Sequence, residues 1–250
     1  MAGEEKQWEK LLRDLVNRLH AAERENLRAV VLYGSAASGE FRPGRSDLNI
    51  LCLLQKLGAA NLSVLRAAFR WWTKKGHPAP LLFTLEELER AADVYAIELL
   101  EVKTHRRILY GEDVLESLRV PLDLHRMQVE RELRHNLIRL REGYVLVADH
   151  RKGTLALMLR SASTFALLFR HSLIALGEEA PSAKRDAVTR LAAVLGFDAS
   201  SFEILFEIRQ GSRPKKQADV PALFGRYLEA ATRAVEAMDH RLAELEPLKP

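Results

Sequence analysis

Cysteine is almost absent from this chain, because Cys52 is the single one. One cysteine excludes an internal disulfide and a zinc site built from several thiolates, and it fits a reducing compartment. Cys52 lies within an apolar run, so we expect it to be a small buried hydrophobe. No apolar run reaches the length of a membrane span, and the charged segment Met1 to Lys10 has no signal-peptide core. These absences predict a cytoplasmic protein with no membrane partner.

A large charge of one sign is also missing. The 38 lysine and arginine residues barely exceed the 34 aspartate and glutamate residues, which leaves a formal net charge of +4. This balance suits an anionic small molecule such as a nucleoside triphosphate, but it does not favour a dedicated nucleic-acid-binding protein. Hydrophobic residues make up 48% of 250 positions, enough to bury one large core or two small ones.

The first half of the chain alternates helix and strand signals. Apolar residues at helical spacing predict one helix from Trp8 to Leu19 and another over 59–75. Thr84 followed by Glu87 is a capping box, which predicts that a short helix begins there. Short apolar runs predict buried strands over 29–33, 48–54, 80–83 and 93–102. This alternation is typical of a sheet covered by helices.

After Gly111 the strand signal stops and only helical patterns follow. We expect helices over 129–144, 155–176, 182–196, 201–210 and about 219–245. The predicted fold class is therefore α+β, with an N-terminal mixed sheet and flanking helices followed by a C-terminal all-α helical bundle. The change of texture places one domain at residues 1–118 and the second at 119–250.

The residues that carry chemistry lie at the ends of the first two predicted strands. Gly34 and Ser35 stop the strand over 29–33, and glycine lets a backbone approach a phosphate closely while serine offers a hydroxyl donor. Asp47 and Asn49 are two residues apart, so on a strand they project to the same face. Two such oxygen donors beside a phosphate cradle predict a magnesium or manganese site shared with substrate phosphates.

A third carboxylate on an adjacent strand would complete a centre for displacement at phosphorus. Glu98 is the candidate, since it is an acid inside an apolar stretch, and Glu101 takes its place if the strand register differs. The predicted metal ligands are therefore Asp47, Asn49 and Glu98.

These residues together resemble the signature of the DNA-polymerase-β-like nucleotidyltransferase superfamily, especially its small prokaryotic and aminoglycoside-nucleotidyltransferase-like members. The resemblance rests on Tyr33-Gly34-Ser35-Ala36-Ala37-Ser38-Gly39 followed by Ser46-Asp47-Leu48-Asn49-Ile50. It covers roughly residues 25–115, where it implies a nucleotidyltransferase domain, and it implies an accessory role for the helical remainder. It implies transfer of a nucleoside monophosphate from a magnesium-bound triphosphate to a hydroxyl acceptor. It also implies that Gly34 and Ser35 bind the nucleotide phosphates and that Asp47 and Glu98 are catalytic.

Two departures from the family pattern bear on activity. Asn49 stands where the family has a second aspartate, so one negative charge is missing and binding of a second cation weakens. Ser38 stands where small members often have arginine, and Arg42 or Arg45 is the available substitute. The sequence thus leaves open a metal-dependent nucleotidyltransferase or a catalytically weakened member that binds nucleotide or a partner protein. A third and weaker alternative is nucleic-acid binding through the helical domain. The sequence does not name the acceptor.

Several basic and aromatic residues have both a structural and a functional interpretation. Arg131, Arg134 and Arg141 form either a solvated helix face or a positive wall for an anionic ligand, and charge patterning favours the first. The stretch 105–107 is basic and follows the strand expected for Glu98, which suits phosphate contacts. Trp71-Trp72 suggests a stacking platform, although the helical stripe assigns Trp72 to packing.

Overall fold

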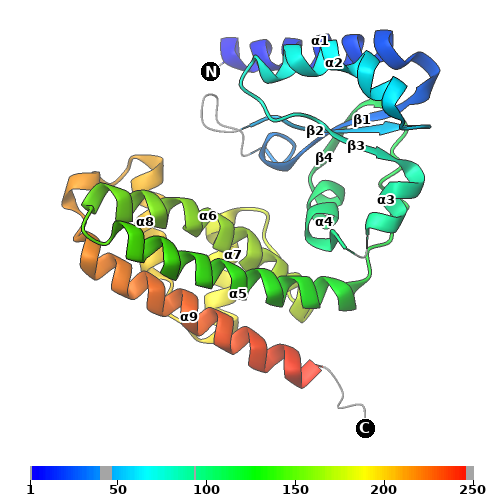
Figure 1. The fold of residues 1–250 in the computed structure, drawn as a ribbon. Helices are drawn as coiled ribbons and strands as arrows, with labels where there is room; N and C mark the ends of the chain where they lie inside the picture. The colour runs from blue at the N-terminus through cyan, green and yellow to red at the C-terminus, as the bar shows by residue number, and fades with distance from the viewer. Residues whose placement is uncertain (1, 40–46, 93, 246–250) are drawn as a thin grey trace. The chain divides into compact units, whose positions relative to one another are not determined.

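The computed structural model describes residues 2–39, 47–92 and 94–245, and it divides the chain into two compact units, residues 1–121 and 122–250 (Figure 1). Arg42 and Arg45 lie outside the described residues. The first unit contains a four-stranded mixed sheet in the order β3-β2-β1-β4. β1 pairs antiparallel with β2 and β4, whereas β3 pairs parallel with β2. The strands are β1 Leu27–Tyr33, β2 Asn49–Leu54, β3 Leu81–Thr84 and β4 Arg106–Gly111.

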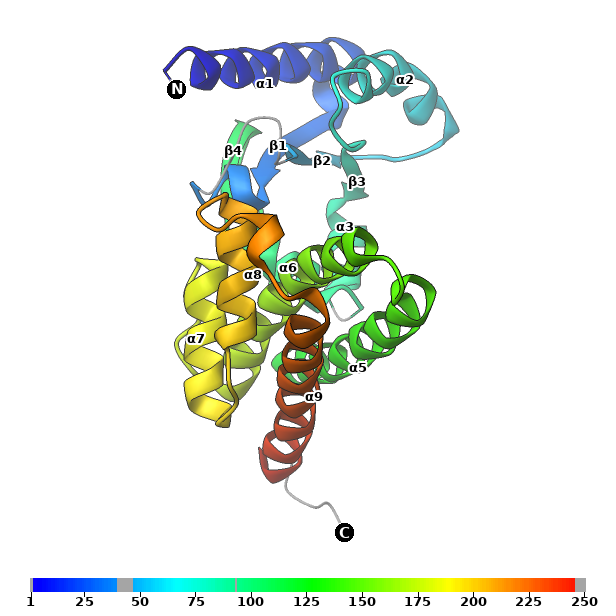
Figure 2. The same cartoon turned by 90° about the vertical axis from the view of Figure 1, so that its left-hand side faces the viewer.

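Helices cover both faces of this sheet, since successive residues of β1 and β2 point to opposite sides. Val30 and Leu32 belong to the cluster that also contains buried side chains of α1 and α2, whereas Ala29 and Val31 belong to the cluster of α3 and α4. Figure 2 shows α1 and α2 together on one side of the strands. The four helices are α1 Ala2–Glu23, α2 Ala59–Thr73, α3 Leu85–Ala91 and α4 Ala96–Thr104.

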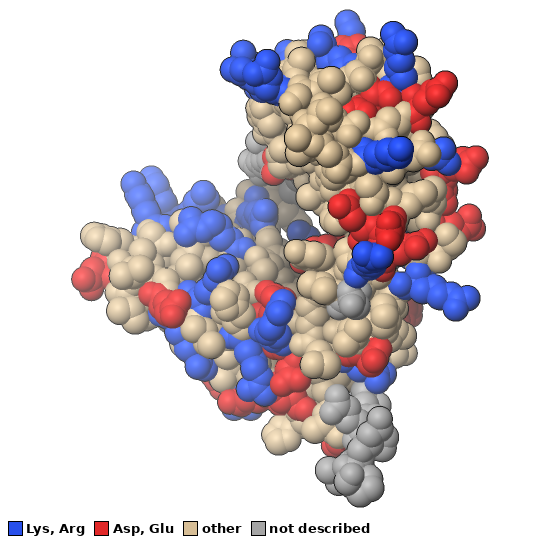
Figure 3. Space-filling model, turned by 45° about the vertical axis from the view of Figure 1, so that its right-hand side comes forward, with Lys and Arg blue, Asp and Glu red and all other residues tan. Residues whose placement is uncertain are grey.

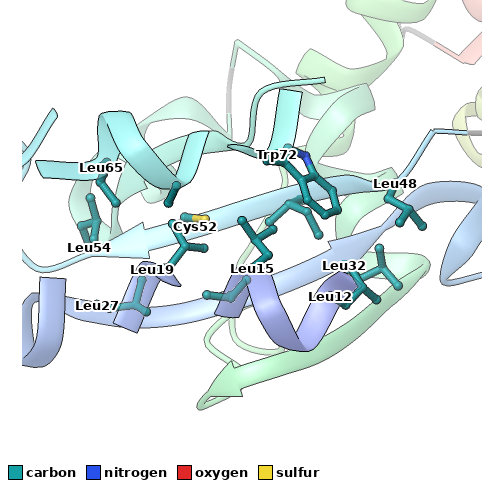
Figure 4. Close-up of a cluster of buried hydrophobic side chains, with 13 residues drawn as sticks. Leu12, Leu15, Leu19, Leu27, Leu32, Leu48, Cys52, Leu54, Leu65 and Trp72 are labelled. Atoms are coloured by element: carbon teal, nitrogen blue, oxygen red, sulfur yellow. The ribbon is translucent and has the colours of Figure 1, made fainter. Parts of the chain in front are cut away.

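The core beneath α1 and α2 holds the largest buried side chain of this unit, Trp72. Figure 4 shows it pointing from α2 toward Leu48, with the leucines of α1 on the neighbouring part of the sheet. Cys52 lies in the same cluster, as expected, and burial raises the pKa of its thiol to about 12. A thiol with such a pKa is neutral at physiological pH and serves as packing.

Most elements expected in the first unit are confirmed. The three strands predicted over 29–33, 48–54 and 80–83 correspond to β1, β2 and β3. The capping box is present, because the Glu87 amide donates to the Thr84 hydroxyl at 3.1 Å and the Thr84 amide donates to the Glu87 carboxylate at 2.8 Å. The predicted fold class, a mixed sheet with flanking helices followed by a helical region, is therefore correct.

The strand predicted over 93–102 is wrong. Residues 96–104 form α4, and the strand that pairs with β1 is β4, which follows it. The physical reason is the period of the pattern. Glu98 and Glu101 are three apart, which places them on one face of a helix, whereas a strand would put them on opposite faces. Leu99 and Val102, which are also three apart, are buried against the sheet.

The second unit is helical throughout its described residues, as the sequence predicts. α6 is the central helix and packs against the four others. Gly177 and Gly196 end their helices in the left-handed conformation, both with φ of 74°, which glycine adopts without a side-chain clash. The helices are α5 Leu122–Val147, α6 Arg151–Leu176, α7 Lys184–Leu195, α8 Ser200–Gln210 and α9 Val220–Leu245. In the described part of the chain, every helix is too short or too polar to cross a bilayer.

Gly111 is the last residue of β4, and its substitution tests how closely the backbones of β1 and β4 pack. Its φ is +79°, and a Cβ there would lie 1.9 Å from the Arg28 carbonyl oxygen. Gly76 has a similar φ of +90° but open space around the same position. We expect Gly76→Ala to lower the free energy of unfolding by about 1 kcal/mol through backbone strain alone. Gly111→Ala should lower it by about 3 kcal/mol, because the β1–β4 backbone must also move. Equal losses in urea unfolding would contradict this account of the pair.

A buried histidine pair joins α5 and α6. His125 and His171 are both inaccessible to solvent, and the His125 Nε2 and His171 Nδ1 atoms lie 2.9 Å apart, so one ring donates to the other. Burial lowers the pKa of His125 to about 4, and the charges of His171 and Arg126 act in the same direction. A neutral His125 therefore belongs to the folded state.

The histidine pair predicts a dependence of stability on pH. Because the pKa of His125 is lower in the folded state than the ordinary 6.5, the unfolded chain binds more protons between these values. The contribution of His125 to the free energy of unfolding is fully present above pH 6.5 and is lost as the pH falls toward 4. We expect the free energy of unfolding to be lower by about 2 kcal/mol at pH 5 than at pH 7. Urea unfolding at both pH values measures this, and His125→Asn should remove most of the difference. His135→Gln, at an exposed position of α5, is the control that keeps it. A difference of the same size in His125→Asn would contradict the assignment.

Candidate functional site

The ends of β1 and β2 form one edge of the sheet. Tyr33, the last residue of β1, pairs with Asn49, the first residue of β2. This antiparallel register brings the Gly34–Ser35 turn next to Asn49, although fifteen positions separate Gly34 from Asn49 in the sequence. The Tyr33 side chain is partly buried beneath the same edge, and burial raises the pKa of its hydroxyl.

Gly34 opens a 3₁₀ turn, Gly34–Ala36, with φ of +76°. The turn closes through its own backbone, since the Ala37 and Ser38 amides donate to the Gly34 carbonyl at 2.9 and 3.0 Å. A Cβ at Gly34 would lie 3.1 Å from Asn49 Nδ2, so the Asn49 amide packs directly over the glycine. Glycine is therefore favoured here by its backbone conformation, and any larger side chain would also displace the Asn49 amide.

Asp47 lies two residues before Asn49 and is exposed, whereas Leu48 between them is fully buried. The buried leucine fixes the entry to β2, and its amide donates to Nδ1 of His77 at 3.3 Å. The imidazole of His77 packs against buried Trp72, with ring centroids 4.8 Å apart. The end of α2 thereby holds the backbone next to Asp47.

The pKa of His77 records its proximity to Asp47. Burial lowers this pKa, and the Asp47 carboxylate opposes the shift by favouring the charged imidazole. The carboxylate and the imidazole are thus close enough to interact electrostatically. His77 could not be predicted from the sequence, because a lone histidine before Pro78 belongs to no motif and only the folded chain brings it to this edge.

Glu98 is not on the sheet. It lies in the first turn of α4 and is exposed, while the opposite end of α4 contacts the Gly34 turn through the His105 carbonyl, which accepts from the Gly34 amide at 3.2 Å. Seven residues of helix separate Glu98 from His105, a rise of about 10 Å along the axis. Glu101 is one turn from His105, at a rise of about 6 Å. The structure brings Gly34, Ser35, Asp47 and Asn49 to one edge and places Glu98 on another element.

The other basic candidates have partners within the structure. Arg106 makes a two-oxygen contact with Asp113, with Nε 2.9 Å from each carboxylate oxygen, and this contact lowers the pKa of Asp113. Arg107 pairs with Glu9 at 2.6 Å. In the second unit, Arg134 pairs with Glu130 and Asp239, Arg131 with Glu132, and Arg141 contacts Thr232. These contacts support the structural interpretation of the arginines.

The protein donors at this edge suit a magnesium ion that takes the rest of its ligands from phosphate and water. Asp47 and Asn49 offer hard oxygen donors on neighbouring positions of one strand end, which suits one cation that completes its shell with phosphate oxygens and water. Among the described residues there is no group of three or more histidine, cysteine, aspartate or glutamate side chains placed to hold a metal. Asp47 and Asn49 therefore offer two protein oxygens to one cation.

The proximity of Asp47 to His77 yields a direct prediction. Asp47→Asn removes the charge that favours the protonated imidazole, so we expect the pKa of His77 to fall further below its ordinary value. Titration of the His77 ring protons by NMR measures the change. Glu86→Gln is the control, because Glu86 pairs with Arg90 on the surface of α3 and does not contribute to the His77 shift. A His77 pKa that rises or stays unchanged in Asp47→Asn would show that the two groups are apart.

Comparison with known proteins finds likenesses among solved structures. No protein-family model and no curated protein matches the chain. Among solved structures, the chain is similar to spectinomycin adenyltransferase AAD(9) from Enterococcus faecialis, a structure with ATP and spectinomycin, at a TM-score of 0.51 and 15% identity. The match covers 92% of this chain and 99% of that one.

A toxin-antitoxin structure with AMP-PNP matches at a TM-score of 0.30 and 17% identity, over 54% of this chain and 95% of that one, and this weaker likeness carries no argument. The adenyltransferase likeness is at the level of fold. The chain thus has a nucleotidyltransferase-like fold, formed by the mixed sheet with its flanking helices and the helical region that follows.

Proposed function

We propose that the first unit binds a magnesium-bound nucleoside triphosphate at the edge formed by Gly34, Ser35, Asp47 and Asn49. The observation that carries the proposal is the packing of the Asn49 amide over Gly34, with Asp47 two residues away. This contact brings the side chains of Asn49 and Asp47, two oxygen donors for a cation, next to the Gly34–Ser35 turn. The adenyltransferase of similar fold was crystallised with ATP, which supports a nucleotide as the ligand.

Each residue has a separate task in this proposal. The Ser35 hydroxyl donates to a phosphate oxygen, and Gly34 supplies the left-handed backbone conformation that forms the turn. The Asp47 carboxylate and the Asn49 side-chain oxygen hold the cation, which when bound neutralises part of the triphosphate charge. His77, through the Leu48 amide and buried Trp72, keeps the backbone before β2 in place.

We further propose that nucleotidyl transfer is weakened in this chain and that its function is that of a nucleotide-binding module. In transfer, an acceptor hydroxyl oxygen bonds to the α-phosphorus, the bond from that phosphorus to the β-phosphate oxygen breaks, and pyrophosphate leaves. This reaction benefits from carboxylates that hold cations and accept the hydroxyl proton. Here an amide at position 49 replaces one acid, and Glu98 lies on α4 instead of the sheet.

The second candidate is full nucleotidyltransferase activity toward a hydroxyl acceptor. It is favoured by the likeness to an adenyltransferase over 92% of this chain and by the retention of Asp47 beside the Gly34 turn. In this case Glu98 or Glu101 accepts the hydroxyl proton. The two candidates share the binding step and differ in turnover.

Binding is tested with fluorescent ATP and GTP analogues by titration in magnesium and in EDTA. We expect magnesium-dependent binding that weakens at least about tenfold in Asp47→Ala, which corresponds to about 1.4 kcal/mol. Asp186→Ala, an exposed acid in the first turn of α7, is the matched control and should bind like wild type. Binding that ignores both magnesium and the Asp47 substitution would eliminate this site.

Turnover is then measured as pyrophosphate release with a panel of hydroxyl acceptors. If the chain is a weakened member, wild type releases little, and Asn49→Asp raises the rate at least about tenfold by restoring the missing charge. Substantial release by wild type, lost in Asp47→Ala and in Glu98→Gln or Glu101→Gln, would establish the second candidate instead.

A further inference from the structure

One long segment of the first unit, residues 48–85, contains no acidic residue. It lies between Asp47 and Glu86, and lysine or arginine occurs in it at positions 56, 66, 70, 74 and 75. This segment contains α2 and β3. Although the net charge of the whole chain is only +4, this segment carries positive charges and no negative ones.

The helix α2 turns its cations to solvent. Its buried residues, Leu65, Ala68 and Trp72, face the sheet. Arg66, Arg70 and Lys74 are spaced four residues apart, are all exposed and form one line on the outer side of the helix. We refer to these three residues as the α2 ridge. Their Cα atoms are separated by about 6 Å along the helix axis.

The ridge charges are not neutralised by the rest of the described chain. None of its three side chains has an ion-pair partner among residues 2–39, 47–92 and 94–245. Several arginines of the second unit that lie on exposed helix faces do have such partners, as Arg233 has in Glu229 and Arg190 has in Glu178. A row of unpaired, like charges on one helix repels itself and is stabilised by a polyanion.

A second cationic group lies on the flank of the ridge. The Arg18 guanidinium of α1 stacks over the Trp71 ring at 4.4 Å from its centroid, and the Lys75 ammonium lies 6.0 Å from the same ring. A cation over an indole face is held in place by the ring electrons while its remaining donors stay available. Trp71 therefore positions two further charges beside the ridge. Figure 3 shows basic side chains projecting from the part of the first unit where α1 and α2 lie.

We propose that the α2 ridge, with Arg18 and Lys75, binds the phosphate backbone of nucleic acid without reading its sequence. A rigid line of cations at regular spacing complements a backbone that carries a regular row of phosphates. Arginine is well suited to this role, because its planar guanidinium donates two hydrogen bonds to one phosphate. These side chains would contact the phosphates of the nucleic acid and not its bases. We therefore expect an affinity that depends on salt concentration and not on base sequence.

Nucleic acid fits this surface better than a membrane or an acidic protein. A helix that lies in a membrane interface exposes a continuous apolar face. In α2, by contrast, Leu65, Ala68 and Trp72 are buried against the sheet, and the exposed large apolar side chains are confined to Leu62 and Val64 in the first turns. Protein interfaces are anchored by aromatic side chains that fill pockets, but Arg18 covers the face of Trp71. The proposal does not depend on nucleotide binding at Gly34, because none of its residues belongs to that site.

The test measures binding of the full chain to a fluorescein-labelled 20-base-pair DNA duplex and a 20-nucleotide RNA by anisotropy, between 50 and 200 mM salt. Four to five phosphate contacts predict a fall of affinity of at least about a hundredfold over this range for duplex. Arg66→Gln with Arg70→Gln should reduce the slope of log K against log salt by about 1.8, since each duplex contact contributes about 0.9. Scrambling the sequence should leave the affinity within about twofold.

The matched control is Arg233→Gln with Arg241→Gln, which removes the same charge from exposed, paired positions of α9. It should keep the slope of the wild type. Thermal melts of both double variants confirm that they fold. Absence of binding at 50 mM salt, or the same loss in both double variants, would overturn the proposal. Binding to vesicles with 30% phosphatidylserine in the absence of nucleic-acid binding would also overturn it.

Discussion

The antiparallel pairing of β1 with β2 is the interaction on which the rest of the first unit depends. Its register puts Val30, Leu32 and Cys52 on one face and Ala29 with Val31 on the other, so one pair of strands supplies both cores. The same register ends with Tyr33 opposite Asn49, which brings the Gly34 turn against a side chain fifteen positions later. If the β1–β2 register shifted by one residue, the side chains of the shifted strand would point to the opposite face of the sheet. The same shift would move Asn49 away from the Gly34 turn.

Helix α2 connects packing to both proposed surfaces. Its buried face ends in Trp72, whose ring supports His77, and His77 accepts from the amide that follows Asp47. Its outer face carries the α2 ridge. Burial of its apolar side chains against the sheet thus fixes the helix, while its solvent-facing side carries the basic residues of the α2 ridge. This division explains how a chain with a net charge of only +4 presents a strongly basic surface.

The sequence predicted those features that depend on local chemistry. The apolar runs of β1 and β2, the capping box at Thr84 and the glycine at position 34 are each specified by a few adjacent residues. The prediction for 93–102 failed because a short apolar run does not distinguish a buried strand from a buried helix, and only the three-residue spacing of Glu98 and Glu101 indicated the helix. The role of His77 was not predictable, since it arises from a tertiary contact with Trp72. The sequence also did not show which arginines are paired, as Arg106 is by Asp113.

The central claim is that the Gly34 turn and the start of β2 together bind the phosphates and cation of one nucleotide. The most direct measurement is a crystal structure of the chain with a non-hydrolysable triphosphate and magnesium. The account predicts phosphate oxygens against Gly34 and Ser35, and one cation at about 2.1 Å from an Asp47 oxygen and the Asn49 side-chain oxygen. Nucleotide bound elsewhere, or bound here with the Asp47 carboxylate turned away from its cation, would contradict it.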